Sequence, residues 1–237
     1  MLILGFGLLV PGIVRPQTSA ARSEWQSLKI VQTGEPAYPL RLMQLGVTEG
    51  EARVVVSVDS TGTLTEWLVT GYTQSDFADS AVAAIREWKF EPARLQGRPV
   101  GVIAELIFHY TAQGVVVSSQ NVGDIIEAQV LRMLDGRYKF RPCAADELDR
   151  VPTPITTVAP AYPRALAQQG VQGAVAVEFY IDETGAVRLP SVAPGESLEL
   201  GGRAIAALSQ WRFTPPTSRG RAVLVKAVQT FNFKDGI

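Results

Sequence analysis

The sequence predicts an α+β protein made of two tandem copies of one small domain, each a short antiparallel sheet with two helices packed on one face. Three observations predict this fold class. A five-residue motif at Trp88–Pro92 returns at Trp211–Pro215, and alternating strand patterns and helical apolar stripes accompany both copies. Two copies are too few for a solenoid, which needs about three repeats, so we expect two separate domains.

The duplication extends beyond this motif. Shifting the chain by 123 residues superimposes an Asp-x-Thr-Gly turn and a closing aromatic strand: Asp59–Gly62 on Asp182–Gly185, and Phe108–Tyr110 on Phe231–Phe233. Upstream the shift becomes 124, where Pro36–Pro39 meets Pro160–Pro163. Insertions are best tolerated in surface loops, so this one-residue slip, between Gly46 and Gly50, marks a loop.

Length and composition limit the possible organisation. We expect four segments: a signal peptide at 1–21, a first domain at 25–112, a linker with an amphipathic helix at 113–150, and a second domain at 151–234. A net charge of −1 with 19% charged residues gives no electrostatic footprint for nucleic acid or an anionic membrane. Cys143 is the only cysteine, so an intrachain disulfide is impossible.

The first residues favour export. Met1–Val14 is almost wholly apolar but too short to span a bilayer, which takes about 20 residues. It fits the apolar region of a secretory signal with a small-residue exit at Ser19–Ala21, although no Lys or Arg precedes it. We therefore expect a periplasmic protein, and keep open an N-terminal core segment or a misassigned start.

Each copy opens with an extended stretch and a short helix. The extended stretches are Leu28–Thr33 and Val151–Val158; Pro152 and Pro154 make the second at best an edge strand. A Tyr-Pro pair then starts a short helix in each copy, at Leu40–Leu45 and Arg164–Gln169, because proline suits the first turn. Gly46 and Gly170 follow where a left-handed cap is wanted.

An alternating strand and a hairpin come next. Ala52, Val54, Val56 and Val58 alternate with other residues, as do Val175, Val177, Phe179 and Ile181, so we expect sheets with one buried face. The Asp-x-Thr-Gly turn closes a hairpin in each copy. The return strands are expected at Leu64–Val69 and Val187–Val192, with Pro190 indicating an edge or a bulge.

A longer helix and a last strand complete each copy. The helix presents one apolar stripe in each copy: Phe77, Ala81, Ala84, Ile85 and Trp88, then Leu200, Ala204, Ala207, Leu208 and Trp211. Ser75 or Asp76 is the expected N-cap, and Lys89 and Arg212 are expected in the last helical turn. The last strands are expected at Val100–Tyr110 and Ala222–Phe233.

Two further segments lie between the copies. Gly123–Leu134 carries apolar residues at helical spacing, which predicts an additional amphipathic helix. Cys143–Asp149 reads as a polar connector.

The ordered set of motifs, present twice over Ala37–Tyr110 and Ala161–Phe233, resembles the C-terminal domain of TonB. The resemblance implies a periplasmic domain that docks on TonB-dependent outer-membrane transporters, or on other periplasmic proteins. In that family a transporter segment, the TonB box, adds as a strand beside the domain's last strand, a mode called β-augmentation. The partner-binding residues so implied are Tyr38, Pro39, Val102, Ala104, Leu106, Tyr162, Pro163, Val225, Ala227 and Gln229.

The chain also departs from the energy-coupling members of that family. They carry an N-terminal transmembrane helix with a functional histidine and then a proline-rich spacer, and this sequence shows neither. The residue before Tyr-Pro, often Gln in the family, is Ala37 or Ala161 here. We therefore expect a soluble tandem binding module rather than a complete transducer.

Nothing in the sequence points to catalysis, a metal, a cofactor or a small-molecule substrate. His109 alternates with core residues and has no second metal ligand, and Cys143 has no activating neighbour in sequence. Turn formation explains Asp59 and Asp182, and a core position explains the signature tryptophans. Tyr38 and Tyr162 have two open interpretations, packing at the start of the helix or partner contact.

Two alternatives to peptide binding stay open. The protein could be structural, with sheet edges that pair with each other or with another protomer in a homodimer. A carboxylate enzyme is the least favoured possibility.

Overall fold

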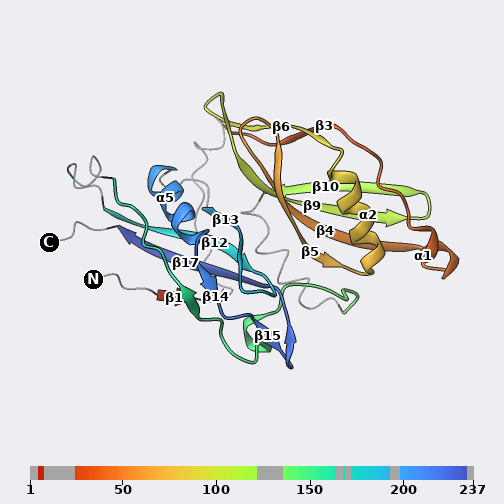
Figure 1. Ribbon diagram of the computed structural model, residues 1–237. Helices are drawn as coiled ribbons and strands as arrows, with labels where there is room; N and C mark the ends of the chain where they lie inside the picture. The colour runs from red at the N-terminus through yellow and green to blue at the C-terminus, as the bar shows by residue number, and fades with distance from the viewer. Residues whose placement is uncertain are drawn as a thin grey trace. The chain divides into compact units, whose positions relative to one another are not determined.

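The computed structural model describes residues 5–7, 25–121, 136–163, 168, 172–192 and 198–233 (Figure 1). The chain divides between Arg141 and Pro142 into an N-terminal unit and a C-terminal unit, and the short strand β1 (Gly5–Gly7) groups with the C-terminal unit. Each unit is an α+β domain with mostly antiparallel strands, as the sequence predicts.

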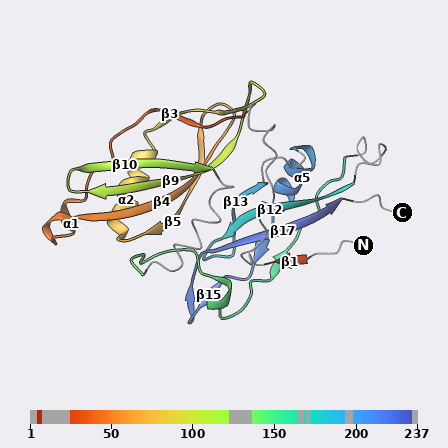
Figure 2. The ribbon, with the colours of Figure 1, turned by 180° about the vertical axis from the view of Figure 1, so that it is seen from behind.

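The N-terminal unit has a four-stranded antiparallel sheet in the order β10-β9-β4-β5, which is seen from behind in Figure 2. Its elements in chain order are β2 (Trp25–Gln26), β3 (Lys29–Gln32), α1 (Leu40–Gln44), β4 (Glu49–Val58), β5 (Leu64–Tyr72), α2 (Ser75–Ile85), β6 (Lys89–Glu91), β7 (Ala93–Leu95), β8 (Arg98–Val100), β9 (Val102–Thr111) and β10 (Gly114–Asn121). Two small sheets, β3-β6 and β2-β7-β8, complete it.

The C-terminal unit repeats this plan, with the sheet order β1-β17-β12-β13. Its other elements in chain order are the 3-10 helix η3 (Ala145–Glu147), β11 (Pro154–Thr156), β12 (Gly173–Ile181), β13 (Val187–Val192), α5 (Leu198–Leu208), β14 (Arg212–Phe213), β15 (Thr217–Ser218), β16 (Arg221–Ala222) and β17 (Val225–Phe233). Part of the extended stretch expected at Val151–Val158 forms β11, which pairs with β14.

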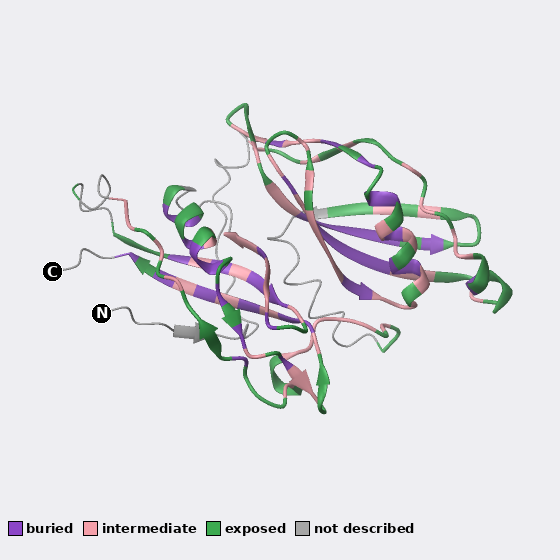
Figure 3. Ribbon diagram, viewed as in Figure 1, coloured by how far each residue is buried: buried purple, intermediate pink, exposed green. Residues whose placement is uncertain are grey.

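The core of each unit lies between the sheet and the longer helix, as Figure 3 shows by burial. Every residue of the predicted stripes on α2 and α5 is buried, including Trp88 and Trp211, which follow the helices. The four alternating valine and alanine positions of β4 are 0% exposed. These stripes meet because a helical period of 3.6 and a strand period of two each leave one apolar face.

Several local predictions are confirmed. Gly46 has the left-handed φ of 71° just after α1, and Pro190 lies in the edge strand β13 beside a register shift. The predicted helices Gly123–Leu134 and Arg164–Gln169 lie outside the described residues, except that Gln168 is helical.

Two predictions about the longer helix are wrong. Gln74 is the N-cap of α2, without a side-chain hydrogen bond, so neither Ser75 nor Asp76 caps the helix. Lys89 and Arg212 lie in β6 and β14 rather than in a last helical turn. The helix ends early because the residues after it pair with the opening strand, as Lys89 does with Gln32.

The expectation of a sheet buried on one face is also wrong for the N-terminal unit. Val55, Glu105 and Ile107 belong to the face turned away from α2, yet each is at most 3% exposed. The segment after the undescribed residues 122–135 contributes to this burial, because the hydroxyl of Tyr138 accepts a hydrogen bond at 2.7 Å from Arg53, which pairs with Ile107 on this face. The sheet therefore buries apolar side chains on both faces, which the alternation in β4 alone does not reveal.

Candidate functional site

The Asp-x-Thr-Gly turn and the tryptophan motif contact each other in both units. Asp59 accepts hydrogen bonds from the backbone N–H of Thr61 and Thr63 at 2.8 and 3.0 Å, and Asp182 does the same in its copy. Gly62 lies so close to the next motif that a Cβ atom would meet the carbonyl oxygen of Phe90 at 2.3 Å. The turn thus packs against the short strand of the tryptophan motif in each unit, β6 or β14.

The signature tryptophans join the opening segment to the core. The indole Nε1–H of Trp88 donates to the carbonyl oxygen of Gly34 at 2.8 Å, and that of Trp211 donates to Val158 at the same distance. A buried indole needs such an acceptor, so each tryptophan both fills the core and anchors the chain before Tyr-Pro. The core position that we expected for both residues is confirmed.

The Tyr-Pro pair lies at the carboxyl end of the last strand. Tyr38 donates its hydroxyl to the carbonyl of Val47 at 2.6 Å, and its ring meets the ring of Tyr110 with centroids 6.4 Å apart. Tyr162 meets Phe233 in the same way at 5.8 Å. Burial raises the pKa of Tyr38. These contacts support packing at the start of the helix, and both tyrosines remain half-buried beside Pro39 and Pro163.

In the N-terminal unit the last strand is not an edge. β10 pairs with β9 over eight residue pairs, from Gly114 opposite Thr111 to Asn121 opposite Ala104. The expectation that Val100–Tyr110 offers a free edge is therefore wrong. A two-residue connection, Ala112–Gln113, lets the chain fold back, and the hydroxyl of Thr111 donates to the carbonyl of Gly114 at 3.0 Å.

The residues expected to bind a partner on β9 face the core. Ala104 is 2% exposed and Leu106 is 0% exposed, while Val102, beyond the last pair with β10, is half-buried. The side chains of Ala104 and Leu106 are therefore committed to packing under α2. Along Ala104–Thr111 a peptide could reach the backbone of β9 only after β10 had left it.

In the C-terminal unit the last strand is covered differently. β1 pairs with β17 over three residues only, placing Gly5–Gly7 opposite Val228–Thr230. Cys143 forms an isolated bridge with Val225 and donates its N–H to Leu224 at 2.7 Å. In the described part of the chain, no strand lies beside the outer side of Phe231–Phe233.

The expected partner residues on β17 also point into the core. Val225, Ala227 and Gln229 are each at most 1% exposed, and all five odd-numbered positions of the strand are buried. The even-numbered positions form the opposite face, where Lys226 pairs with Glu178 of β12 at 2.9 Å. What β17 can offer a partner is thus its backbone and this second row of side chains.

A cluster of charged side chains sits on the second face of the N-terminal sheet. The guanidinium of Arg53 contacts Glu51 and the fully buried Glu105, at 2.5 and 3.4 Å. His109 lies 3.2 Å from Glu51, and Tyr138 donates its hydroxyl to Glu51 as well. The partner of His109 is thus a carboxylate of its own sheet.

A protein-family model matches both copies of the repeated unit. The model for the Gram-negative bacterial TonB protein C-terminal matches residues 34–112 and again residues 158–234. The chain belongs to the TonB C-terminal family. The two matched ranges together span more than half of the chain, and each contains one Tyr-Pro pair, one Asp-x-Thr-Gly turn and one tryptophan motif.

The comparison with solved structures also finds a TonB C-terminal domain. It is the solution NMR structure of the Pseudomonas aeruginosa TonB C-terminal domain, at 30% sequence identity over 38% of this chain and 91% of that domain, with a TM-score of 0.32. No curated protein matches.

Membership of the TonB C-terminal family sets the broad role. Its domains are non-catalytic transducer domains that act in the periplasm in TonB-dependent energy transduction, and the family implies interaction with TonB-dependent transporters. Among the described residues, no helix has the length and hydropathy to cross a membrane. The same residues contain no group of three His, Cys, Asp or Glu side chains arranged to hold a metal ion.

Proposed function

We propose that this protein is a periplasmic binding module in which the C-terminal unit takes up an extended peptide as a strand beside β17. The observation that carries the proposal is the unequal covering of the two last strands. β9 is paired along eight residues by β10, whereas β17 is paired along three by β1. An incompletely paired edge presents backbone donors and acceptors to an incoming strand.

The origin of β1 strengthens this proposal. Gly5–Gly7 lies within residues 1–21, the segment expected to be a signal peptide. Cleavage of that segment on export would remove β1 and leave β17 as the outer strand of its sheet. The exported form would then be the form that binds.

The chemistry of the edge fits an extended peptide rather than a small molecule. The backbone of β17 supplies hydrogen bonds without regard to sequence. Alternate side chains of the added strand would lie beside the even-numbered row, which includes Lys226, Val228 and Thr230. Extended segments of outer-membrane transporters, such as TonB boxes, are the partners that the family membership favours.

The proposal is tested by titrating a TonB-box-like peptide into isotope-labelled protein that begins at residue 22. Amide signals of Val225–Phe233 should shift in proportion to bound peptide. Shifts confined to other loops, or to β10 and β13, would contradict the proposal.

A pair of neighbouring proline variants makes this test sharper. In an antiparallel strand the backbone groups of successive residues point to opposite sides, so of Val228 and Gln229 only one directs its N–H away from β12. Proline at the outward position should abolish peptide binding and leave the sheet intact. Proline at the inward position should instead disrupt the sheet, which circular dichroism would show.

A structural role is the second candidate, and β10 favours it. This outer strand contains no charged residue, and Val116 is 66% exposed. Uncharged outer strands tend to pair with other chains, so two copies could join through β10. A dimer in light scattering that dissociates on Val116→Lys would favour this role, and a monomer would exclude joining of two copies through β10.

A further inference from the structure

The two units carry the same two-residue hairpin turn in the same conformation. Gln96 and Gly97 join β7 to β8 with φ angles of 52° and 75°, and Arg219 and Gly220 join β15 to β16 with 51° and 71°. Positive φ at both central residues defines a type I′ turn. The flanking residues form the hairpin pairs, so the two central N–H groups can bind an acceptor outside the hairpin.

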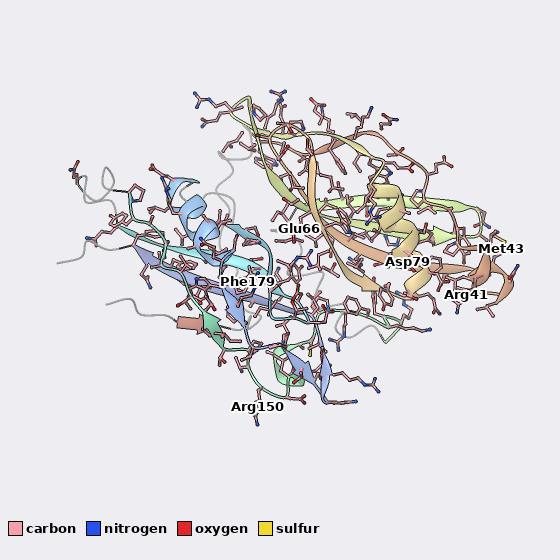
Figure 4. The ribbon with its side chains drawn as sticks, in the orientation of Figure 1. Arg41, Met43, Glu66, Asp79, Arg150 and Phe179 are labelled. Atoms are coloured by element: carbon pink, nitrogen blue, oxygen red, sulfur yellow. The ribbon has the colours of Figure 1, made fainter. Side chains whose placement is uncertain are left out.

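In the C-terminal unit this turn binds a carboxylate. The two carboxylate oxygens of Asp149 accept hydrogen bonds from the N–H of Arg219 at 2.7 Å and of Gly220 at 2.8 Å. The bond from Gly220 is the main reason that the pKa of Asp149 lies below its usual range. Arg150, the next residue, is exposed and points away from the unit (Figure 4).

In the N-terminal unit the equivalent position holds a neutral side chain. Gln26 of β2 pairs with Arg94 of β7. In the C-terminal unit Asp149 donates its backbone N–H to the carbonyl of Thr217, the residue of β15 that lies 123 residues after Arg94. Among the described residues, none accepts a hydrogen bond from the N–H of Gln96 or Gly97. The turn therefore has the geometry of its copy without a carboxylate from its own chain.

The charges around this turn favour an anion. The guanidinium of Arg94 donates to the carbonyl of Gly97 at 3.0 Å, so its charge lies at the turn. Arg98, which is exposed, follows directly. A Cβ atom built on Gly97 would meet nothing within 4 Å, so the approach is open. Two backbone donors with guanidinium groups beside them suit the two oxygens of one carboxylate.

We propose that the Gln96–Gly97 turn binds the carboxylate of an acidic side chain on an extended partner polypeptide. The turn's duplicate shows that this conformation holds a carboxylate in a bidentate manner, and Arg94 adds a charge that the duplicate lacks, since Thr217 stands at its place. The site is independent of strand addition at β17, so the two proposals can fail separately. It would let the N-terminal unit, whose last strand is covered, contribute to recognition.

The test uses the full chain, labelled with 15N, and two blocked five-residue peptides that differ only in a central glutamate or glutamine. The glutamate peptide should shift the amides of Gln96 and Gly97, and the glutamine peptide should not. Gln26→Asp supplies the missing carboxylate within the chain and should lower the affinity for the glutamate peptide about tenfold. Gln26→Asn, which stays neutral, is the matched control and should leave it unchanged.

The reciprocal variant completes the design. Asp149→Asn removes the carboxylate from the C-terminal turn, so Arg219 and Gly220 should gain a response to the glutamate peptide. Equal shifts with both peptides, no shift at Gln96 and Gly97, or an unchanged response in Gln26→Asp would each overturn the proposal. If inorganic phosphate shifts these amides and the glutamate peptide does not, the turn is a phosphate site and the proposal is wrong.

Discussion

At the scale of single residues, two turn glycines separate the need for a left-handed φ from the need for close packing against backbone. Gly62 and Gly97 both have left-handed φ angles, of 86° and 75°. Only Gly62 is also packed against backbone, where a Cβ atom would meet the carbonyl oxygen of Phe90 at 2.3 Å. A side chain at Gly97 is strained but has room, whereas one at Gly62 must also displace the strand of the tryptophan motif.

This contrast gives a prediction with a built-in control. Gly97→Ala should cost about 1 kcal/mol of unfolding free energy, the usual price of a left-handed alanine. Gly62→Ala should cost more, about 3 kcal/mol, because the backbone of Phe90 must also move. Urea unfolding of both variants measures the difference. Equal losses would show that the contact with Phe90 does not constrain the turn.

A second residue-scale prediction concerns Tyr110. Burial raises its pKa to about 12 from an ordinary value of 10.0. Because the folded pKa is the higher one, its stabilising contribution is complete below pH 10 and is lost as the pH rises to about 12. Unfolding free energy should therefore fall over this range.

The control for Tyr110 is the phenylalanine variant. Tyr110→Phe removes the titrating hydroxyl, so unfolding free energy should no longer fall with pH in the alkaline range. Near neutral pH the variant should lose about 1 kcal/mol of unfolding free energy, because the hydroxyl no longer donates to the carbonyl of Phe77. An identical alkaline slope in both proteins would assign the loss to other groups.

At the scale of elements, strongly periodic segments could be predicted and irregular ones could not. β4 and α2 alternate or repeat cleanly, and their buried faces follow from that pattern. β10 was missed because Val115–Val117 are consecutive and the following residues are polar, which gives no period of two. The hairpins β7-β8 and β15-β16 have only two- or three-residue strands, too short for a periodic signal.

The candidate site was predictable only in part for the same reason. The sequence identifies β17 and the Tyr-Pro pair, because both belong to a repeated motif. Which strand lies beside β9 or β17 depends on pairing with segments outside the motif. β1 comes from the opposite end of the chain, and no local pattern could reveal its pairing with Val228–Thr230.

The difference between β9 and β17 yields a prediction about β10. Replacing Val115 and Val117 with aspartate should release β10 from the sheet, because both side chains pack against the core. Backbone groups of β9 would then become available, and the N-terminal unit should begin to bind the peptide that shifts β17. Amide titration of the variant and of the unmodified chain makes the comparison. A double variant that keeps its fold but gains no response on β9 would contradict this role of β10.

At the scale of the whole molecule, the duplication has produced two units with one plan and different surroundings. One last strand is covered by the segment that follows it, and the other by a strand from the N-terminal segment. One type I′ turn holds a carboxylate of its own chain, and its copy does not. Such differences are how two copies of one fold can acquire separate contacts with a partner.

The covering of β17 by β1 predicts that peptide affinity depends on the N-terminal segment. A chain that begins at residue 22 should bind the peptide more tightly than the full chain. The gain should be about tenfold if pairing of β1 with the same edge is favourable by about 1.4 kcal/mol. Isothermal titration calorimetry of both chains measures the ratio. Weaker binding by the shorter chain would show that β1 helps to form the site.

The most direct test is amide hydrogen exchange of the chain that begins at residue 22, with and without a TonB-box-like peptide. Strand addition requires outward amides of Val225–Phe233 to become bonded, so we expect their exchange to slow by at least about tenfold while the amides of β9 remain unchanged. Binding of the peptide without any slowing in β17 would contradict the account.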